Sequence, residues 1–332
     1  MLVAVTRTAS FEHDYRIASD HAGLLDRSER GKLALTGSGA KEFLHGQVTN
    51  DITGLSPGDG CYAAFLTQKG KMLGDLRVLD CGDELLLDTE RPALQELFNM
   101  IRRFSIGYDV QLHKRTLESG LVSLVGPQAD EVVTAAFEQD GRARERSSAL
   151  PGPEEHTHVA GRIGTAEVNV IRTDIGLDVL CGADATDAVR RALIAVGAAE
   201  IGPEAADCIR IERGRPRYGI DLDDSVIPQE AGLNERAVSF TKGCYVGQET
   251  VARLYYKGKP NRELRGLRSA QPLAPGTEIT CDGRIVGTVT SATVSPRLGP
   301  LALALVRREA PVGTTVDAGA LGDADVVALP FA

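Results

Sequence analysis

The segment from Lys242 to Glu249 contains the residues best suited to chemistry in this chain. It reads Lys-Gly-Cys-Tyr-Val-Gly-Gln-Glu, so an ammonium lies two residues before the thiol of Cys244. A nearby ammonium favours the thiolate, and Gly243 leaves the backbone free to adopt unusual conformations. Gln248 adds an amide within about one turn of the thiol if the segment is helical. Two interpretations remain open: a reactive or ligand-facing thiol, or a buried cysteine in a tight turn, because free cysteine is often buried.

Glu212 is the second candidate, in a stretch of alternating charge, Gly and Pro from Arg210 to Asp221. A carboxylate can accept two parallel N–H bonds from an amino-pyrimidinone edge, the group shared by pterins and guanine. The alternative is an ion pair with Arg213 or another neighbouring arginine, because such pairs are abundant on protein surfaces. Spacing alone favours the ion pair.

Other chemical motifs are missing from the sequence. The six histidines form no triad or metal spacing, and the six cysteines contain no CxxC pair, so we expect neither a metal site nor a disulfide framework. No Walker loop or GxGxxG motif follows a strand. Residues 141–159 are rich in Arg, Ser, Pro and Glu, which predicts an exposed loop with His156 and His158 in solvent.

Composition excludes some classes of protein. The chain has 332 residues, enough for two or three domains, and a net charge of −9. An acidic chain is a poor general binder of nucleic acid. No apolar run approaches the roughly 20 residues of a membrane helix, and the N-terminus lacks a basic region followed by a long apolar stretch. We therefore expect a cytoplasmic protein that binds neither nucleic acid nor membranes.

Two segments of the sequence repeat one order of elements. Residues 76–87 predict a hairpin and residues 94–104 an amphipathic helix; residues 166–181 and 189–196 predict the same pair again. Each pair follows a similar strand–Gly–helix segment, residues 35–44 in one case and 124–133 in the other. This pattern predicts two related α+β halves. After about residue 261, Gly-punctuated β-branched runs predict a small barrel or sandwich.

The Lys242–Glu249 segment resembles the hallmark motif of the YgfZ family, relatives of the glycine cleavage T-protein, a tetrahydrofolate-dependent aminomethyltransferase. The resemblance covers nearly the whole chain, although the other matching segments are less specific than the motif. Those segments are Phe43 to Asp51, Phe65 to Met72, Arg210 to Asp221, Ile227 to Asn234 and Gly287 to Ser291.

The resemblance implies an α+β, T-protein-like three-domain ring with two related α+β halves and a C-terminal β-barrel. The expected domains are 1–115, 116–258 and 259–332, with the first two intertwined and the motif in the second. The implied cofactor is tetrahydrofolate or a one-carbon derivative, held in a central channel. By analogy, Cys244 and Lys242 would be the catalytic residues and Glu212 would hold the pterin head. The remaining cofactor-binding residues implied are Lys242, Tyr245, Gln248 and Glu249.

Departures from the T-protein bear on activity. T-proteins carry an Asn-Ala pair and then a catalytic Asp, where this chain has Asp88-Thr89 and no Asp in residues 91–97; they also have Asp in place of Cys244. Aminomethyl transfer needs a carboxylate near the reacting amine. The resemblance therefore favours a folate-binding accessory protein whose partners are iron–sulfur client enzymes or assembly factors. The alternatives are a folate-dependent aminomethyl- or methyltransferase and a scaffold that has lost its ligand.

Overall fold

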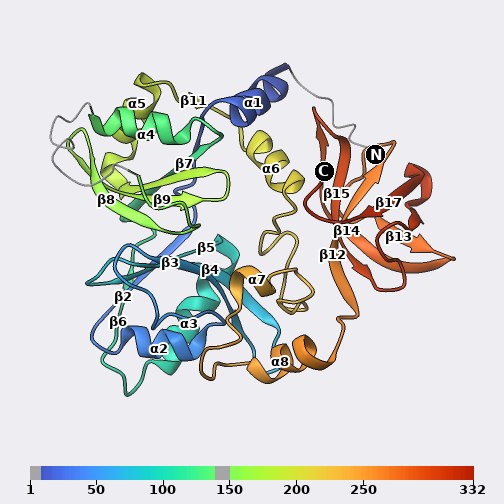
Figure 1. The fold of residues 1–332 in the computed structure, drawn as a ribbon, viewed down its shortest axis with the longest axis horizontal. Helices are drawn as coiled ribbons and strands as arrows, with labels where there is room; N and C mark the ends of the chain where they lie inside the picture. Colours follow the sequence, from blue (N-terminus) through green and yellow to red (C-terminus); the bar gives the residue numbers. More distant parts are fainter. Residues whose placement is uncertain (1–8, 139–149) are drawn as a thin grey trace.

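A computed structural model describes residues 9–138 and 150–332. Two sheets lie one above the other on one side of the molecule, and a barrel lies on the other side (Figure 1). Helix α6 and the segment that follows it run between the sheets and the barrel (Figure 1). Within the described residues, no helix is long and apolar enough to span a membrane.

The first sheet is antiparallel, with strand order β3-β4-β5-β2-β6. Its strands are β2 (Gly31–Thr36), β3 (Gly60–Leu66), β4 (Met72–Asp80), β5 (Leu85–Thr89) and β6 (Gln111–Lys114). Helices α2 (Ala40–Gln47) and α3 (Leu94–Phe104) belong to this unit. Leu97 and Ile101 recur at helical spacing and lie buried in the same apolar cluster as Leu33 and Val78 of the sheet. Strand β4 is buried along almost its whole length.

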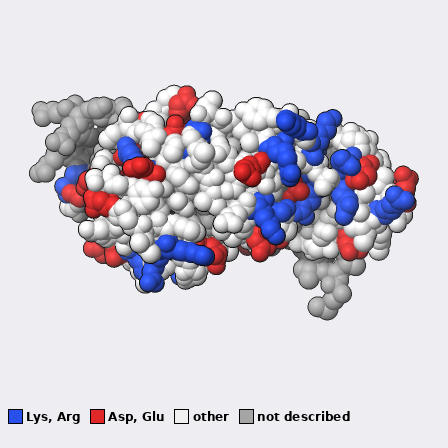
Figure 2. Space-filling model, turned by 90° about the horizontal axis from the view of Figure 1, so that it is seen from below, with Lys and Arg blue, Asp and Glu red and all other residues white. Residues whose placement is uncertain are grey.

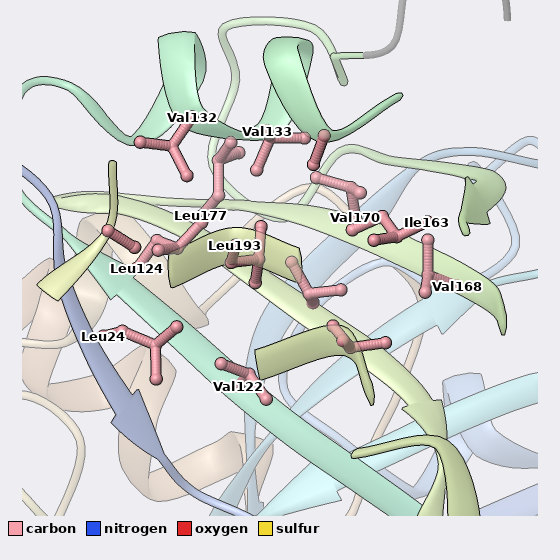
Figure 3. Packing of buried hydrophobic residues seen from close by; sticks show 14 of the residues in the cluster. Leu24, Val122, Leu124, Val132, Val133, Ile163, Val168, Val170, Leu177 and Leu193 are labelled. Carbon is pink, nitrogen blue, oxygen red and sulfur yellow. The ribbon is translucent and has the colours of Figure 1, made fainter. Parts of the chain in front are cut away.

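The second sheet has six strands, in the order β11-β1-β7-β10-β9-β8. These are β1 (Gly23–Asp26), β7 (Ser119–Val125), β8 (His158–Ile163), β9 (Ala166–Thr173), β10 (Gly176–Gly182) and β11 (Ala199–Glu200). Only the β1–β11 pair is parallel among the described strands. Val132 of α4 (Ala129–Glu138) and Leu193 of α5 (Thr186–Ala195) pack with Leu124 and Leu177 of the sheet (Figure 3).

The remaining helices connect these units. Helix α1 (Ala9–Asp20) packs against α6 (Pro203–Glu212), which starts with a proline at a position where no backbone N–H is needed. The chain then returns to the first sheet through α7 (Asn234–Ala237) and α8 (Gln248–Lys257). Buried residues of this returning segment, including Leu222 and Val251, share one cluster with Ala64 and Met72 of the first sheet.

The C-terminal unit is a closed barrel with strand order β12-β15-β14-β13-β16-β17. Its strands are β12 (Arg262–Ser269), β13 (Glu278–Cys281), β14 (Arg284–Ser295), β15 (Gly299–Arg307), β16 (Thr315–Asp317) and β17 (Asp323–Val327). Alternate residues of β15, Ala302, Ala304 and Val306, belong to its core. Ile211 of α6 joins the barrel residues Leu264 and Phe331 in a separate cluster, which fixes the barrel to the rest of the molecule.

The predicted fold class is confirmed: two α+β halves precede a closed barrel. In both halves a strand ends at a glycine with positive φ, Gly37 at 103° and Gly126 at 127°, and a helix follows. A hairpin and a second helix come next in each half, as predicted. Strand β1, however, lies in the sheet of the second half. The domain boundaries stay a prediction.

The predicted exposed loop is only partly described, because residues 139–149 lie outside the described ranges. The expectation that His156 and His158 are solvated is wrong, since both are buried. His158 hydrogen-bonds Asn169 Oδ1 through Nδ1 at 3.0 Å and the Asp80 carbonyl through Nε2 at 3.1 Å. The segment thus runs against the first sheet, where the ring of His158 has polar partners on both nitrogens.

Candidate functional site

A cavity of about 690 Å³ lies between the two sheets and α6. Its volume falls within the range of small-molecule sites. Charged side chains from both sheets and from the segment after α6 line it: Arg27, Arg30, Asp75, Arg77, Glu90, Asp178, Arg217 and Arg236. So many buried charges in one place require pairing or a polar ligand.

Arg77 joins the two sheets through buried ion pairs beside this cavity. It donates to Asp88 Oδ2 of its own sheet and to Asp178 Oδ2 of the other sheet, both at 2.6 Å. Arg30 donates to Asp88 Oδ1 at 2.8 Å and also pairs with Glu90. Burial alone would raise the pKa of Asp88, but Arg30 and Arg77 hold it well below its usual range.

Asp75 is a buried carboxyl group in the wall of the cavity. It accepts a hydrogen bond of 2.6 Å from the Tyr62 hydroxyl. Burial raises the pKa of Asp75 to about 6, although the Tyr62 hydrogen bond opposes this shift. A carboxyl with such a pKa can take up and release a proton near neutral pH. Sequence reasoning missed Asp75; the available signal was a strand in which Asp75 and Arg77 interrupt a mostly apolar run.

His156 contributes a neutral ring to the cavity wall. Its φ is 75°, a left-handed conformation that non-glycine residues rarely adopt, and its ring centroid lies 6.2 Å from that of Tyr62. Burial, helped by Arg77 and Arg236, lowers the pKa of His156 to about 3. Within the described part of the chain, its Nδ1 has no hydrogen-bond partner.

Lys242 fixes a loop of the first half. Its ammonium donates to the carbonyls of Val48 at 2.7 Å and Asn50 at 2.9 Å, and also to that of His45. These bonds use all three of its hydrogens, so none remains for the Cys244 sulfur. Burial lowers the pKa of Lys242 to about 8. The expected role in tuning Cys244 stays a prediction, whereas the contacts show Lys242 acting as a clamp on this loop.

Cys244 is solvent-exposed, so the interpretation as a buried cysteine is wrong. The segment around it is not helical, because α8 begins only at Gln248. Gly247, with φ of 86°, starts that helix, and a Cβ on it would lie 2.5 Å from the Thr67 carbonyl oxygen. This close approach holds the motif against the β3–β4 turn and leaves the thiol outside.

Helix α8 exposes cations beside the motif. Arg253 within α8, Lys257 at its end and Lys259 just after it are all exposed. Figure 2 shows Lys and Arg side chains gathered on one part of the face seen from below, the side on which α8 lies in Figure 1. A locally basic surface therefore exists on a chain of net charge −9.

The other predicted cofactor-binding residues of the motif differ in burial. Tyr245 is buried in an apolar cluster, and burial raises its pKa to about 12. The Lys242 ammonium lies 5.0 Å from its ring centroid. Gln248 is partly buried and Glu249 exposed. None of these four is among the residues lining the 690 Å³ cavity. Their role in holding folate stays a prediction.

Asn50 connects the motif to the cavity. Its backbone carbonyl accepts from Lys242, while its side-chain amide donates to the carbonyl of Tyr62 at 2.9 Å and to that of Arg236 at 3.4 Å. The Arg236 guanidinium lies over the Tyr62 ring, 5.1 Å from its centroid, and Tyr62 in turn contacts Asp75. The clamp formed by Lys242 thus supports one wall of the cavity.

Glu212 lies apart from this wall, at the junction of α1, α6 and the barrel. Its Oε1 accepts from the Tyr15 hydroxyl at 2.8 Å and from Ser295, and its Oε2 accepts from Arg297 at 3.4 Å. The carboxylate is buried and fully engaged in joining three elements. Glu212 as the residue that holds the pterin stays a prediction, but its present contacts are structural.

No group of three or more His, Cys, Asp or Glu side chains arranged to hold a metal ion occurs within residues 9–138 and 150–332. Across the same residues the six cysteines are free thiols, four of them at least partly exposed.

Replacing Lys242 by Met tests the clamp. The substitution keeps a long apolar stem but leaves three carbonyls without their donor, so we expect the free energy of unfolding to fall by about 1–3 kcal/mol. Urea unfolding measures this change. Lys257→Met removes the same charge from an exposed position and should unfold like the wild type. An equal effect of both substitutions would contradict the clamp.

Comparison with known proteins places this geometry in a family. Residues 5–242 match the model of the GCVT N-terminal domain, and residues 262–332 match that of the glycine cleavage T-protein C-terminal barrel domain. An aminomethyltransferase of Geobacillus kaustophilus is 29% identical, over 97% of this chain and 90% of the relative. A putative chloroplastic transferase of Arabidopsis thaliana is also 29% identical, over 89% of this chain and 68% of the relative.

The crystal structure of the glycine cleavage system aminomethyltransferase T of Bartonella henselae superposes with a TM-score of 0.83 at 25% identity. The match covers 97% of this chain and 89% of the other. Both halves and the barrel are therefore shared with these proteins, and the chain belongs to the glycine cleavage T-protein family.

Proposed function

We propose that this chain binds tetrahydrofolate or a one-carbon derivative in the 690 Å³ cavity and, in the cytoplasm, supports the assembly or repair of iron–sulfur clusters in client enzymes. The observation that carries the folate proposal is the position of the buried Asp75 carboxyl in a space between the two sheets that Tyr62 and His156 also line. Membership of the T-protein family supports it, since relatives are named aminomethyltransferases.

The chemistry of the cavity fits a reduced folate. A pterin head presents N–H donors along one edge, and a carboxyl group such as that of Asp75 is a natural acceptor for such an edge. Tyr62 and His156 offer flat ring faces, and Arg217 and Arg236 offer cations for the carboxylates of the tail. When bound, folate would supply the nitrogen that carries a one-carbon unit; the protein would supply orientation, exclusion of water and a proton-exchanging carboxyl.

The iron–sulfur part of the proposal rests on the motif from Lys242 to Glu249, which resembles that of the YgfZ family. In the structure this motif exposes the Cys244 thiol, while Lys242 supports the cavity wall. An exposed thiol can meet a partner protein, as a client enzyme or an assembly factor would require. The proposal is thus supported by an accessible thiol on the same segment as Lys242, which supports the cavity wall.

A second candidate function is folate-dependent aminomethyl or methyl transfer. The argument against it was the lack of Asp in residues 91–97. The cavity nevertheless holds a carboxyl group of suitable pKa, because Asp75 enters it from β4. Asp75 could position the reacting amine or exchange its proton, so this specific observation favours a transferase. A turnover assay with tetrahydrofolate and an amine donor would distinguish the two functions.

Filling the cavity should abolish folate binding. Ala206 of α6 lines the cavity, so Ala206→Trp would place an indole in the space that the pterin needs. We expect tetrahydrofolate to raise the melting temperature of the wild type, because a ligand of the native state stabilises it, and to leave the variant unchanged. Glu204→Trp puts the same side chain on an exposed position of the same helix and should retain the shift. A wild type unaffected by saturating tetrahydrofolate would refute the proposal.

The role of the exposed thiol is tested by Cys244→Ser in cells that lack the protein. We expect the variant to restore little of the activity of an iron–sulfur enzyme that depends on the protein, while Cys281→Ser, in the barrel, restores all of it. Enzyme activity in extracts, normalised to the amount of enzyme, is the measurement. Full restoration by Cys244→Ser would mean that the thiol is not needed.

The pKa of Asp75 predicts a pH-dependent stability difference. Because burial raises the pKa from 3.8 to about 6, the folded state binds more protons than the unfolded state between these values. The contribution of Asp75 to stability is therefore present below pH 3.8 and lost as the pH rises through 6. Relative to the wild type, the free energy of unfolding of Asp75→Asn should rise by up to about 3 kcal/mol between pH 4 and pH 7. Urea unfolding at several pH values checks this, with the exposed Asp83→Asn as the control that should show no such trend.

A further inference from the structure

The last part of helix α8 exposes aromatic rings to solvent. Tyr255 is 49% exposed and Tyr256 is 67% exposed. Phe240, which precedes the motif, stacks on Tyr255 with 3.7 Å between the ring centroids, and Tyr256 meets the Tyr255 ring edge-on at 5.0 Å. The three rings, which we call the aromatic cluster, thus hold one another in place at the surface. Exposed aromatic side chains of this kind are typical of sites that bind other proteins.

Cations without partners accompany the aromatic cluster. From the start of α8 to the lysine that follows it, the exposed charged residues are one carboxylate, Glu249, and three cations, Arg253, Lys257 and Lys259. None of the three cations forms an ion pair within the described residues. Their charge is therefore available to an anionic partner.

The turn between β3 and β4 adds a fourth cation. A Cβ on Gly70 would lie 2.8 Å from the Thr250 side chain, so this turn packs against α8. Lys69, next to Gly70, is exposed, and it too has no ion pair within residues 9–138 and 150–332. Helices α7 and α8 contribute two exposed carboxylates, Glu235 and Glu249. The cations remain in excess, on a chain whose net charge is −9.

The aromatic cluster lies close to the exposed thiol of Cys244. Phe240 precedes Cys244 by four residues, a stretch that spans at most about 14 Å when fully extended. Stacking on Phe240 brings Tyr255, from the end of α8, back to this stretch. Thr241 and Gly243, which lie between, are exposed as well. An interface of standard size covers about 800 Å² of each partner, which is enough to include the rings, the cations and the thiol.

We propose that the aromatic cluster and the cations of α8 form a docking surface for an acidic segment of a partner protein, and that docking there brings the partner to the Cys244 thiol. The inference rests on the proposed role of Cys244 in meeting a client enzyme or an assembly factor, and it adds the chemistry of that partner. Charge complementarity selects an acidic segment, because opposite potentials speed the encounter and like charges are rejected. The rings supply the kind of contact that dominates the binding energy of interfaces.

A single-stranded nucleic acid also uses aromatic rings and cations, but two features favour a protein. One face of the Tyr255 ring is already covered by Phe240, so few free faces remain on which successive bases could stack. A phosphate backbone would also extend beyond the local cations into the field of a chain with a net charge of −9. A short acidic segment needs only the local positive charge.

The test measures how fast Cys244 of the whole chain reacts with cysteine peptides of opposite charge. The acidic peptide is Glu-Glu-Tyr-Cys-Glu-Glu, the basic peptide has Lys in place of each Glu, and both carry a 2-pyridyl disulfide on the cysteine. The Cys244 thiolate attacks the peptide sulfur, a new disulfide forms, and pyridine-2-thione leaves and is measured by its absorbance. The rate that Cys244→Ser retains belongs to other thiols and is subtracted. We expect the acidic peptide to react on the order of tenfold faster at low ionic strength, and the ratio to fall as salt is added.

Charge reversal on α8 should remove this preference. In the double variant Arg253→Glu with Lys257→Glu, we expect the ratio of the two rates to fall to about one or below. The matched control is Arg162→Glu with Arg284→Glu, which changes two exposed arginines of the second sheet and the barrel and should keep the wild-type ratio. In cells that lack the protein, the α8 variant should restore little activity of a dependent iron–sulfur enzyme, while the control restores it. Both should retain the rise in melting temperature with tetrahydrofolate.

Other outcomes separate this inference from the proposed function. Equal rates for the two peptides in the wild type, or a ratio that the α8 variant leaves unchanged, would overturn the docking surface and leave the proposed function standing. Full restoration of the iron–sulfur enzyme by the α8 variant would do the same. Full restoration by Cys244→Ser would overturn the proposed role of the thiol and the inference with it. Binding of a single-stranded oligouridylate that the α8 variant loses would assign the surface to nucleic acid and overturn the protein partner.

Discussion

The ion pairs of one buried arginine determine how the two halves of this protein meet. Arg77 on β4 reaches Asp88 in its own sheet and Asp178 in the other, and nearby Leu79, Leu86 and Ile171 supply an apolar contact between the sheets. Buried ion pairs add little net stability, because desolvation offsets their attraction, but removing one partner is strongly unfavourable. Their effect is to specify one arrangement of the sheets, and the cavity exists only in that arrangement.

The same burial explains the unusual protonation states around the cavity. Desolvation penalises the charged form of any group, so it raises the pKa of Asp75 and lowers that of His156. Asp88 experiences the same desolvation but has two arginine partners, and its pKa falls. Firmly charged carboxylates, Asp88 next to the cavity and Glu90 in its wall, therefore lie near one that exchanges its proton near neutral pH. This difference in pKa comes from the ion pairs that each carboxyl group forms and not from how deeply the group is buried.

The sequence predicted the architecture well because its signals are local. Hydrophobic periodicity and the glycines after β2 and β7 indicated the repeated halves, and short Gly-punctuated runs indicated the barrel. The cavity could not be predicted in the same way. Asp75 and Asp178 lie 103 positions apart in the sequence, on strands of different sheets, and nothing in either local pattern shows that they face one space. His156 was misplaced because its polar neighbours indicate solvent, whereas the fold places it between sheets.

The structure also separates two residues that the motif places side by side. Lys242 points inward and directs all its hydrogens to the loop from His45 to Asn50, while Cys244 lies on the surface. Through Asn50 that loop holds the backbone of Tyr62, the residue whose hydroxyl contacts Asp75. A partner protein that contacts Cys244 would touch the chain two residues from Lys242. Lys242 is in turn connected to the cavity wall through the hydrogen-bonded loop from His45 to Asn50. A chain of covalent neighbours and hydrogen bonds thus runs from the surface thiol of Cys244 to the interior carboxyl of Asp75.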